Sequence, residues 1–310
     1  MIGASADLGS NSVHLLVAEI GDHSLLPLVD ESEFLGLGAA VDANGALGAD
    51  GRGRLVETIV RYVTTAREHG ATEITLVGTE PIRRAADAAR IVADIDAATG
   101  IPVHVLTHEE EAYLTLVGVT AGRPVADETL VVDIGGGSSE FCAVAPGGIA
   151  RASGLRLGSN RLTADHVVAD PPTPDELEAM ATAADEALER ALDAAPQEVV
   201  AVGGTASNLL KVAPGGPGDQ TVTRGRVVAA VSTLTSAPSA VISNRFAVNP
   251  TRARILPAGA VIMSALMRRY RVEQLRVSEA SLREGAIHAV HHAGGAWRDR
   301  LPALAHGWLD

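Results

Sequence analysis

The chain has 310 residues, of which 46% are hydrophobic and 20% charged, and its formal net charge is -13 at pH 7. The apolar content excludes a disordered chain and the length suits two domains, while the negative charge disfavours nucleic acid or an anionic membrane as a partner. No apolar run suits a transmembrane helix, and the N-terminus carries Asp7 and Asn11 where a signal peptide would be apolar, so we expect a cytoplasmic protein.

Before residue 119 the sequence predicts three strands and then alternating helices and strands. Alternation of apolar and polar residues marks the strands, and apolar residues at helical spacing mark the helices. The predicted strands lie at 2–8, 13–20, 25–29, 74–77 and 103–106, and the predicted helices at 52–69, 85–98 and about 109–117. The first three strands are typical of an antiparallel meander, because short polar turns join them.

The same order begins again after residues 119–128, which lose periodicity, carry Gly and Pro and are typical of a linker. We therefore predict two domains, 1–124 and 125–310, with a substrate cleft between them and a tail after about 295 that returns to the first domain. The second half has predicted strands at 129–134, 141–145, 149–155, 199–202 and 275–277, a loop at Gly203-Gly204-Thr205, and helices after a capping box at 173–176, after that loop, between about 224 and 270 and at about 281–291.

Two strand-turn-strand segments carry the most chemical information. DLGSNS at 7–12 and DIGGGSSE at 133–140 each place an aspartate at a strand end, followed by glycine and hydroxyl residues. Such turns point several N–H groups and hydroxyls at one anion, so two of them could hold a phosphate chain from both sides. An ordinary hairpin turn would explain one such segment, but two at the same point of a repeated order favour a phosphate site.

Other residue types restrict the chemistry further. The one lysine, Lys211, lies outside any GxxxxGK(S/T) loop, so phosphate binding depends on Arg, Ser, Asn and backbone N–H groups. The one cysteine, Cys142, cannot form an internal disulfide and is predicted to be a core residue. The ten histidines, His291 and His292 among them, are scattered and are predicted to lie on the surface.

Seven segments, taken in order, form a recognisable set. They are DLGSNSVHLLV at 7–17, TEPIRRA at 79–85, HEEEA at 108–112, VVDIGGGSSE at 131–140, GGT at 203–205, RARILPAG at 252–259 and LREG at 282–285. Together they resemble the exopolyphosphatase and guanosine pentaphosphate phosphatase (Ppx/GppA) family over most of the chain. The resemblance implies an α/β fold of two ribonuclease H-like domains, as in the actin, Hsp70 and sugar-kinase superfold, with an interdomain cleft.

Carried over by position, the resemblance implies Glu111 as the general base and Glu140 as a second catalytic carboxylate. Phosphoanhydride hydrolysis needs an aligned water, a carboxylate near it and positive charge on the transferred group. Mg²⁺ is the expected cofactor, with Asp133 as the firmer candidate ligand and Asp7 as the second. A favourable acidic first helical turn would explain Glu109 without any function. The implied phosphate-binding residues are Ser10, Asn11, Ser12, Arg83, Gly135, Gly136, Gly137, Ser138, Gly204 and Thr205.

The sequence therefore predicts a hydrolase that releases terminal phosphate from polyphosphate. Alternatives stay open: guanosine pentaphosphate as the main substrate, a sensor that binds phosphate chains or nucleotides without turnover, and a sugar-kinase-like transferase. Glu111 and Glu140 favour turnover, whereas Gly36, where the family usually has a substrate-cleft arginine, mildly favours a sensor. Arg84 is expected to be solvated. Neither a nucleic acid nor a membrane is an expected partner, and the chain could assemble as a homodimer.

Overall fold

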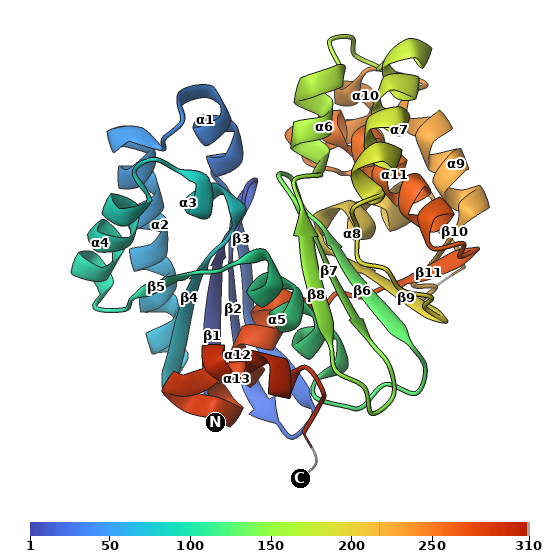
Figure 1. Cartoon of the computed structure of the whole chain (residues 1–310). Coiled ribbons are helices and arrows are strands. Elements are labelled where there is room, and N and C mark those ends of the chain that lie inside the picture. Colours follow the sequence, from blue (N-terminus) through green and yellow to red (C-terminus); the bar gives the residue numbers. More distant parts are fainter. Residues whose placement is uncertain (217, 309–310) are drawn as a thin grey trace. The chain divides into compact units, whose positions relative to one another are not determined.

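A computed structural model of the chain describes residues 1–216 and 218–308 and divides them into two compact units. Unit 1 comprises Met1–Pro124, Gly147–Ala150 and the chain from Ala280 on, and unit 2 comprises Val125–Pro146 and Arg151–Glu279. Each unit is a mixed β-sheet packed against helices (Figure 1), so both are α/β units. Within the described ranges, no helix combines the length and the apolar character needed to cross a membrane.

Unit 1 is built on a sheet of five strands. Its elements are β1 (Ile2–Leu8), β2 (Ser12–Gly21), β3 (Ser24–Phe34), α1 (Leu37–Asn44), α2 (Gly48–Glu68), β4 (Glu73–Gly78), α3 (Glu80–Arg84), α4 (Ala88–Thr99), β5 (Val103–Val105), α5 (His108–Thr120), α12 (Leu282–Ala293), the 3₁₀ helix η1 (Gly294–Ala296) and α13 (Trp297–Leu304). The strand order is β3-β2-β1-β4-β5. Strands β1 to β3 pair antiparallel, which confirms the predicted meander, and β1, β4 and β5 pair parallel.

Different helices cover the two faces of this sheet. Helices α2 and α4 lie on one face, and α5 and α12 lie on the other (Figure 1). Ile59 and Ile95 belong to the core on the first side, with Leu15 of β2. Ile287 of α12 packs with Leu16 of β2 on the second side. Because successive residues of a strand point to opposite faces, one strand contributes to both cores.

Helix α12 belongs to unit 1 because two glycines let it approach α5 closely. A Cβ atom on Gly118 would lie 1.9 Å from the carbonyl oxygen of Ser281, and one on Gly285 would lie 1.8 Å from that of Leu114. Neither position has room for a side chain. The chain accordingly joins unit 1 again at Ala280, ahead of the position near 295 that the sequence suggested, and helix packing accounts for the glycine of the LREG segment.

Unit 2 repeats this plan with a longer set of helices. Its elements are β6 (Thr129–Ile134), β7 (Ser139–Val144), β8 (Arg151–Leu155), α6 (Ser159–His166), α7 (Pro174–Leu188), β9 (Glu198–Val202), α8 (Gly203–Val212), β10 (Thr221–Thr223), α9 (Arg224–Leu234), α10 (Ser239–Phe246), α11 (Pro250–Arg269) and β11 (Gln274–Val277). The strand order β10-β11-β9-β6-β7-β8 contains the same antiparallel meander and parallel neighbours as unit 1. The predicted repeat of the first half is therefore confirmed.

Several sequence predictions need correction. Gly203-Gly204-Thr205 is the first turn of α8 and not a loop, since β9 runs directly into the helix. Cys142 is buried on β7, and burial raises the pKa of its thiol to about 12, which confirms the core prediction. The surface prediction is wrong for His288, which is 1% exposed on α12, because the imidazole packs with other rings, 5.6 Å from that of Trp308 between centroids.

Candidate active site

The first phosphate turn joins β1 to β2 and is fixed by backbone hydrogen bonds. Gly9 N donates to Ser12 O at 3.2 Å, Gly36 N to Asn11 O at 2.9 Å and Gly38 N to Ser10 O at 2.8 Å. The carboxylate of Asp7, near the end of β1, lies against this turn, 3.5 Å from the place of a Cβ on Gly9. The sequence-predicted residues at 7–12 therefore share one rigid corner of unit 1.

Gly36 has a structural reason to be glycine. It precedes α1 with φ of 64°, in the left-handed region that other residues rarely adopt. Its N–H is also one of the donors that hold the first turn. An arginine here would have to adopt the same strained backbone, so the conformation of the chain favours glycine at this position.

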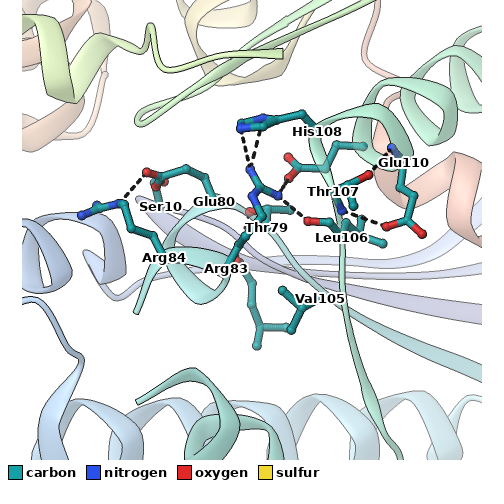
Figure 2. A network of polar contacts seen from close by, with 12 residues as sticks. Ser10, Thr79, Glu80, Arg83, Arg84, Val105, Leu106, Thr107, His108 and Glu110 are labelled. Atoms are coloured by element: carbon teal, nitrogen blue, oxygen red, sulfur yellow. Dashed lines mark hydrogen bonds and ion pairs between the residues drawn. The ribbon is translucent and has the colours of Figure 1, made fainter. Parts of the chain in front are cut away.

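Glu111 and Arg83 form an ion pair in unit 1, and Figure 2 shows Arg83 with its neighbours Leu106 and His108. Arg83 lies in α3, and its Nη1 donates to the Glu111 carboxylate and to the carbonyl of Leu106, while Nη2 lies 3.1 Å from Nδ1 of His108. Glu111 is 5% exposed. The structure thus brings together two of the sequence-predicted residues, and it adds His108, whose role the sequence did not reveal.

The three consecutive glutamates of α5 have different surroundings. Glu110 forms a capping box with Thr107 and an ion pair with Arg298 at 2.7 Å. Glu109 is exposed, as expected for an acidic residue in a first helical turn. Glu111 alone of the three is buried. The helix start therefore accounts for two of these carboxylates but not for the buried Glu111.

A second polar network lies behind the first turn, and the sequence analysis missed it. Ser10 Oγ donates to Glu80 Oε2 at 3.3 Å, and Arg84 Nε donates to Glu80 Oε1 at 2.7 Å (Figure 2). Arg84 also pairs with Asp42 of α1 at 2.7 Å. The prediction that Arg84 is solvated is therefore wrong, because its guanidinium joins two carboxylates. The spacing of four residues between Glu80 and Arg84 was a signal for this pair.

The second phosphate turn joins β6 to β7 and is packed tightly from behind. Gly135 N donates to Ser138 O at 3.0 Å, and Arg161 Nε of α6 donates to Gly137 O at 3.2 Å. A Cβ on Gly158 would lie 2.3 Å from the carbonyl oxygen of Gly136. Close backbone contact therefore fixes this turn, and Arg161 brings positive charge to it.

Asp133 and Glu140 are cross-strand partners on β6 and β7, so both side chains lie on one face of the sheet. Burial raises the pKa of Asp133 to about 6. A Cβ on Gly203 would lie 2.4 Å from Asp133 Oδ1, so the carboxylate fits into a notch that glycine provides. The oxygen donors here suit a hard divalent cation, and such a cation would offset the cost of burying the charge.

Asp7 has different electrostatic surroundings. It lies close to Arg283 of α12. Burial lowers the pKa of Arg283, but the negative charges of Glu284, Asp30 and Asp7 have the larger combined effect, so the pKa of Arg283 is raised. Asp7 thus has a neighbouring cation within unit 1, whereas burial is the one resolved cause at Asp133. The two strand aspartates therefore differ in their electrostatic surroundings.

The N-terminus of α8 completes the unit 2 part of the site. No described side chain caps this helix, so the N–H groups of Gly204 and Thr205 belong to its open first turn. Arg252 of α11 covers that turn, since a Cβ on Gly204 would lie 1.8 Å from its Nη1. Burial lowers the pKa of Arg252, and among the described residues no carboxylate forms an ion pair with it. This corner is therefore suited to an anion.

A model of the Ppx/GppA phosphatase family matches residues 16–292. The chain belongs to this family. Exopolyphosphatase 1 of Mycobacterium tuberculosis is 29% identical over 303 residues, covering 91% of this chain and 86% of the relative. The guanosine-5'-triphosphate,3'-diphosphate pyrophosphatase of Vibrio cholerae is 26% identical over 290 residues, covering 92% of this chain and 58% of the relative.

Solved structures of Ppx/GppA proteins agree with this assignment. The Aquifex aeolicus family member has a TM-score of 0.82 at 27% identity, covering 95% of this chain and 99% of that one. An exopolyphosphatase from Cytophaga hutchinsonii has a TM-score of 0.83 at 22% identity, covering 94% and 97%, which supports the fold. The two mixed sheets with their helices are thus consistent with the two-domain actin-like fold predicted from the sequence.

Proposed function

We propose that this Ppx/GppA phosphatase releases terminal orthophosphate from inorganic polyphosphate. The observation that carries the proposal is the burial of Glu111 against Arg83, while its neighbours Glu109 and Glu110 are accounted for by the start of α5. A held carboxylate beside a guanidinium is suited to activate water next to a phosphoryl group. The name of the mycobacterial relative, which matches over 86% of its length, supports this substrate class.

In the proposed reaction Glu111 accepts a proton from a water aligned with the terminal phosphorus. The water oxygen forms a bond to phosphorus as the phosphoanhydride bond breaks, which releases orthophosphate and a chain shorter by one phosphate. Arg83 binds oxygens of the transferred group through its planar guanidinium. Glu140 is proposed as the second catalytic carboxylate, from its position in the family motif.

We propose Mg²⁺ as the cation, with Asp133 as the firmer ligand and Asp7 as the second. When bound, Mg²⁺ would neutralise charge on the phosphoryl oxygens. Charge and N–H donors of unit 2, including Arg161 and Arg252, would hold more of the substrate. The proposed phosphate-binding set is Ser10, Asn11, Ser12, Arg83, Gly135, Gly136, Gly137, Ser138, Gly204 and Thr205.

The second candidate is hydrolysis of guanosine pentaphosphate at its 5' phosphate chain. Its support is the Vibrio cholerae relative, of which this chain spans 58%. The longer coverage of the mycobacterial exopolyphosphatase favours polyphosphate. A cytoplasmic homodimer is the accompanying proposal, and it depends on the sequence and the resemblance; sedimentation analysis tests the assembly.

Phosphate release from long polyphosphate, tripolyphosphate and guanosine pentaphosphate, each with Mg²⁺ and with EDTA, tests the proposal. We expect release from polyphosphate with Mg²⁺ and none with EDTA. Faster release from guanosine pentaphosphate than from either inorganic chain would favour the second candidate. Tight binding of all three without any release would contradict catalysis and indicate a sensor.

A further inference from the structure

Four side chains form a continuous polar chain behind the first phosphate turn. Ser10 Oγ contacts Glu80 at 3.3 Å, Glu80 contacts Arg84 at 2.7 Å, and Arg84 contacts Asp42 at 2.7 Å (Figure 2). The Glu80 side chain is 6% exposed. The proposed reaction uses none of Glu80, Arg84 or Asp42, so a buried carboxylate at this position needs a separate explanation.

The chemistry of Glu80 decides the direction of its bond to Ser10. An ionised carboxylate can only accept hydrogen bonds, and Glu80 accepts one from Arg84 at its other oxygen, Oε1. The hydroxyl of Ser10 must therefore donate its single proton to Oε2. Ser10 Oγ then has only its lone pairs left, and these can accept a hydrogen bond or bind a cation but cannot donate.

The backbone of Ser10 is also held in place. Gly38 N donates to Ser10 O at 2.8 Å, and a Cβ on Gly38 would lie 3.0 Å from Ser10 Cβ. Because Asp42 and Gly38 both belong to α1, this helix contacts the backbone of Ser10 directly and contacts Glu80 through Arg84. Helix α1 therefore helps to hold both Ser10 and the carboxylate that accepts its proton.

We propose that Glu80 is a positioning residue that presents Ser10 Oγ as an acceptor for the divalent cation or a water bound to it, and not as a donor to phosphate. The inference rests on the proposed function and refines the role of one member of its phosphate-binding set. Phosphate oxygens need donors, whereas a hard cation and its waters need oxygen acceptors. The Asp7 carboxylate against the same turn offers a second oxygen ligand.

The variant Glu80→Gln should reverse the direction of the hydrogen bond between Ser10 and residue 80, with almost no change in side-chain volume. Arg84 keeps the amide oxygen as its acceptor, so the amide NH₂ faces Ser10 and donates to Oγ. The Ser10 proton is then released toward the site, where it suits phosphate and repels a cation. We expect the affinity for Mn²⁺, titrated without substrate and followed by electron paramagnetic resonance, to fall about tenfold or more, the usual cost of losing an outer-shell partner of a metal site.

Three further measurements separate positioning from a merely structural role. Ser10→Ala should lose about as much Mn²⁺ affinity as Glu80→Gln, and the double variant should lose no more than either, because both act through one oxygen. Inhibition by inorganic phosphate should be unchanged or stronger in Glu80→Gln. Glu176→Gln, a matched change in the capping box of α7 in unit 2, should lower the melting temperature and leave the Mn²⁺ affinity unchanged.

The results separate this inference from the proposed function. Mn²⁺ affinity equal to the parent's in Glu80→Gln, weaker phosphate inhibition in that variant, or a parent chain that binds no Mn²⁺ would each overturn the role of Glu80. Absence of phosphate release by the parent chain would overturn the proposed function instead, because the Mn²⁺ titration needs no turnover.

Discussion

The two phosphate turns share one backbone hydrogen bond but differ in their other contacts. In each, a glycine N–H donates to the carbonyl of a serine three residues later, at 3.2 Å for Gly9 and 3.0 Å for Gly135. At the first turn Ser10 contacts Glu80, which pairs with Arg84. At the second turn the backbone packs more closely, at Gly158, and Arg161 donates to a carbonyl. Different substitutions should therefore disrupt each turn.

The strands beside the turns differ in the chemistry that they can carry. Asp7 is paired across the strands with His14, whereas Asp133 is paired with Glu140. Unit 2 therefore has two carboxylates on adjacent strands of one face. In unit 1, Asp7 faces a histidine across the strands, and the buried Glu111 lies on helix α5. The two units thus share a strand arrangement but differ in where their acidic residues lie.

The largest expected effect comes from removing either catalytic carboxylate. If units 1 and 2 both contribute a catalytic carboxylate, Glu111→Gln and Glu140→Gln should each lower the turnover number by about a hundredfold or more. This is the low end for a lost acid-base group. Glu110→Gln is the matched control, because its carboxylate serves helix capping; it should lower the melting temperature and leave turnover within about twofold. Retention of more than about half the parental rate in both catalytic variants would contradict the assignment.

Adding a methyl group beside each turn tests how tightly the two turns are packed. In Gly158→Ala the new Cβ would lie 2.3 Å from Gly136 O and 2.6 Å from Gly137 N, so backbone must move. We expect a loss of about 1–3 kcal/mol of stability from overpacking and about a hundredfold lower turnover from the displaced turn. Gly38→Ala, with its nearest contact at 3.0 Å, should have smaller effects on both. Equal effects in urea melts and rate assays would refute the distinction.

Acid should destabilise unit 1 through a buried histidine. Burial, followed by the nearby His292, His291 and His23, lowers the pKa of His288 to about 4. Between pH 6.5 and 4 the unfolded chain binds a proton at this residue and the folded chain does not. The free energy of unfolding is therefore unaffected above pH 6.5 and decreases by about 3 kcal/mol as the pH falls to 4. Urea melts across this window should show a shallower pH slope in His288→Leu. The exposed control His69→Leu should keep the parental slope, and an unchanged slope in His288→Leu would contradict the prediction.

Neutralisation should change stability differently at the two strand aspartates. Burial raises the pKa of Asp133 from 3.8 to about 6, so a charge there costs stability above pH 6. Asp133→Asn should therefore raise the unfolding free energy in EDTA at pH 7.5 by about 1–3 kcal/mol. Asp7→Asn removes a partner of Arg283 and should give no such gain. The prediction fails if Asp133→Asn unfolds at a lower urea concentration than the parent.

The smallest expected effect is a gain in stability from a substitution in helix α2, away from both turns. A Cβ on Gly53 would have no atom within 4 Å, whereas a Cβ on Gly51 would lie 2.7 Å from Leu47 Cγ. Gly53→Ala should stabilise the chain by about 0.5–1 kcal/mol, since alanine loses less entropy in a helix. Gly51→Ala should destabilise it, and thermal melts that rank the two variants the other way would contradict this.

Local pattern determined much of the fold and the identity of the main candidates. Alternating apolar residues indicated the two meanders, because each strand must present one face to a core. Asp133 stood out because it ends a strand before a glycine turn, whereas Glu140 was a candidate because of its position in the family motif. Such features depend on residues that are adjacent in the sequence, so they can be recognised without the structure.

Tertiary structure decided the rest, because the partners are distant in sequence. Ser10 and Glu80 are 70 positions apart, and nothing in either segment showed that a buried carboxylate takes the serine proton. The early return of the chain at Ala280 depends on Gly118 and Gly285, which matter only when α5 and α12 touch. Burial of His288 likewise follows from the packing around it. Close approach and desolvation are properties of the packed chain, so the pattern of residues alone could not predict them.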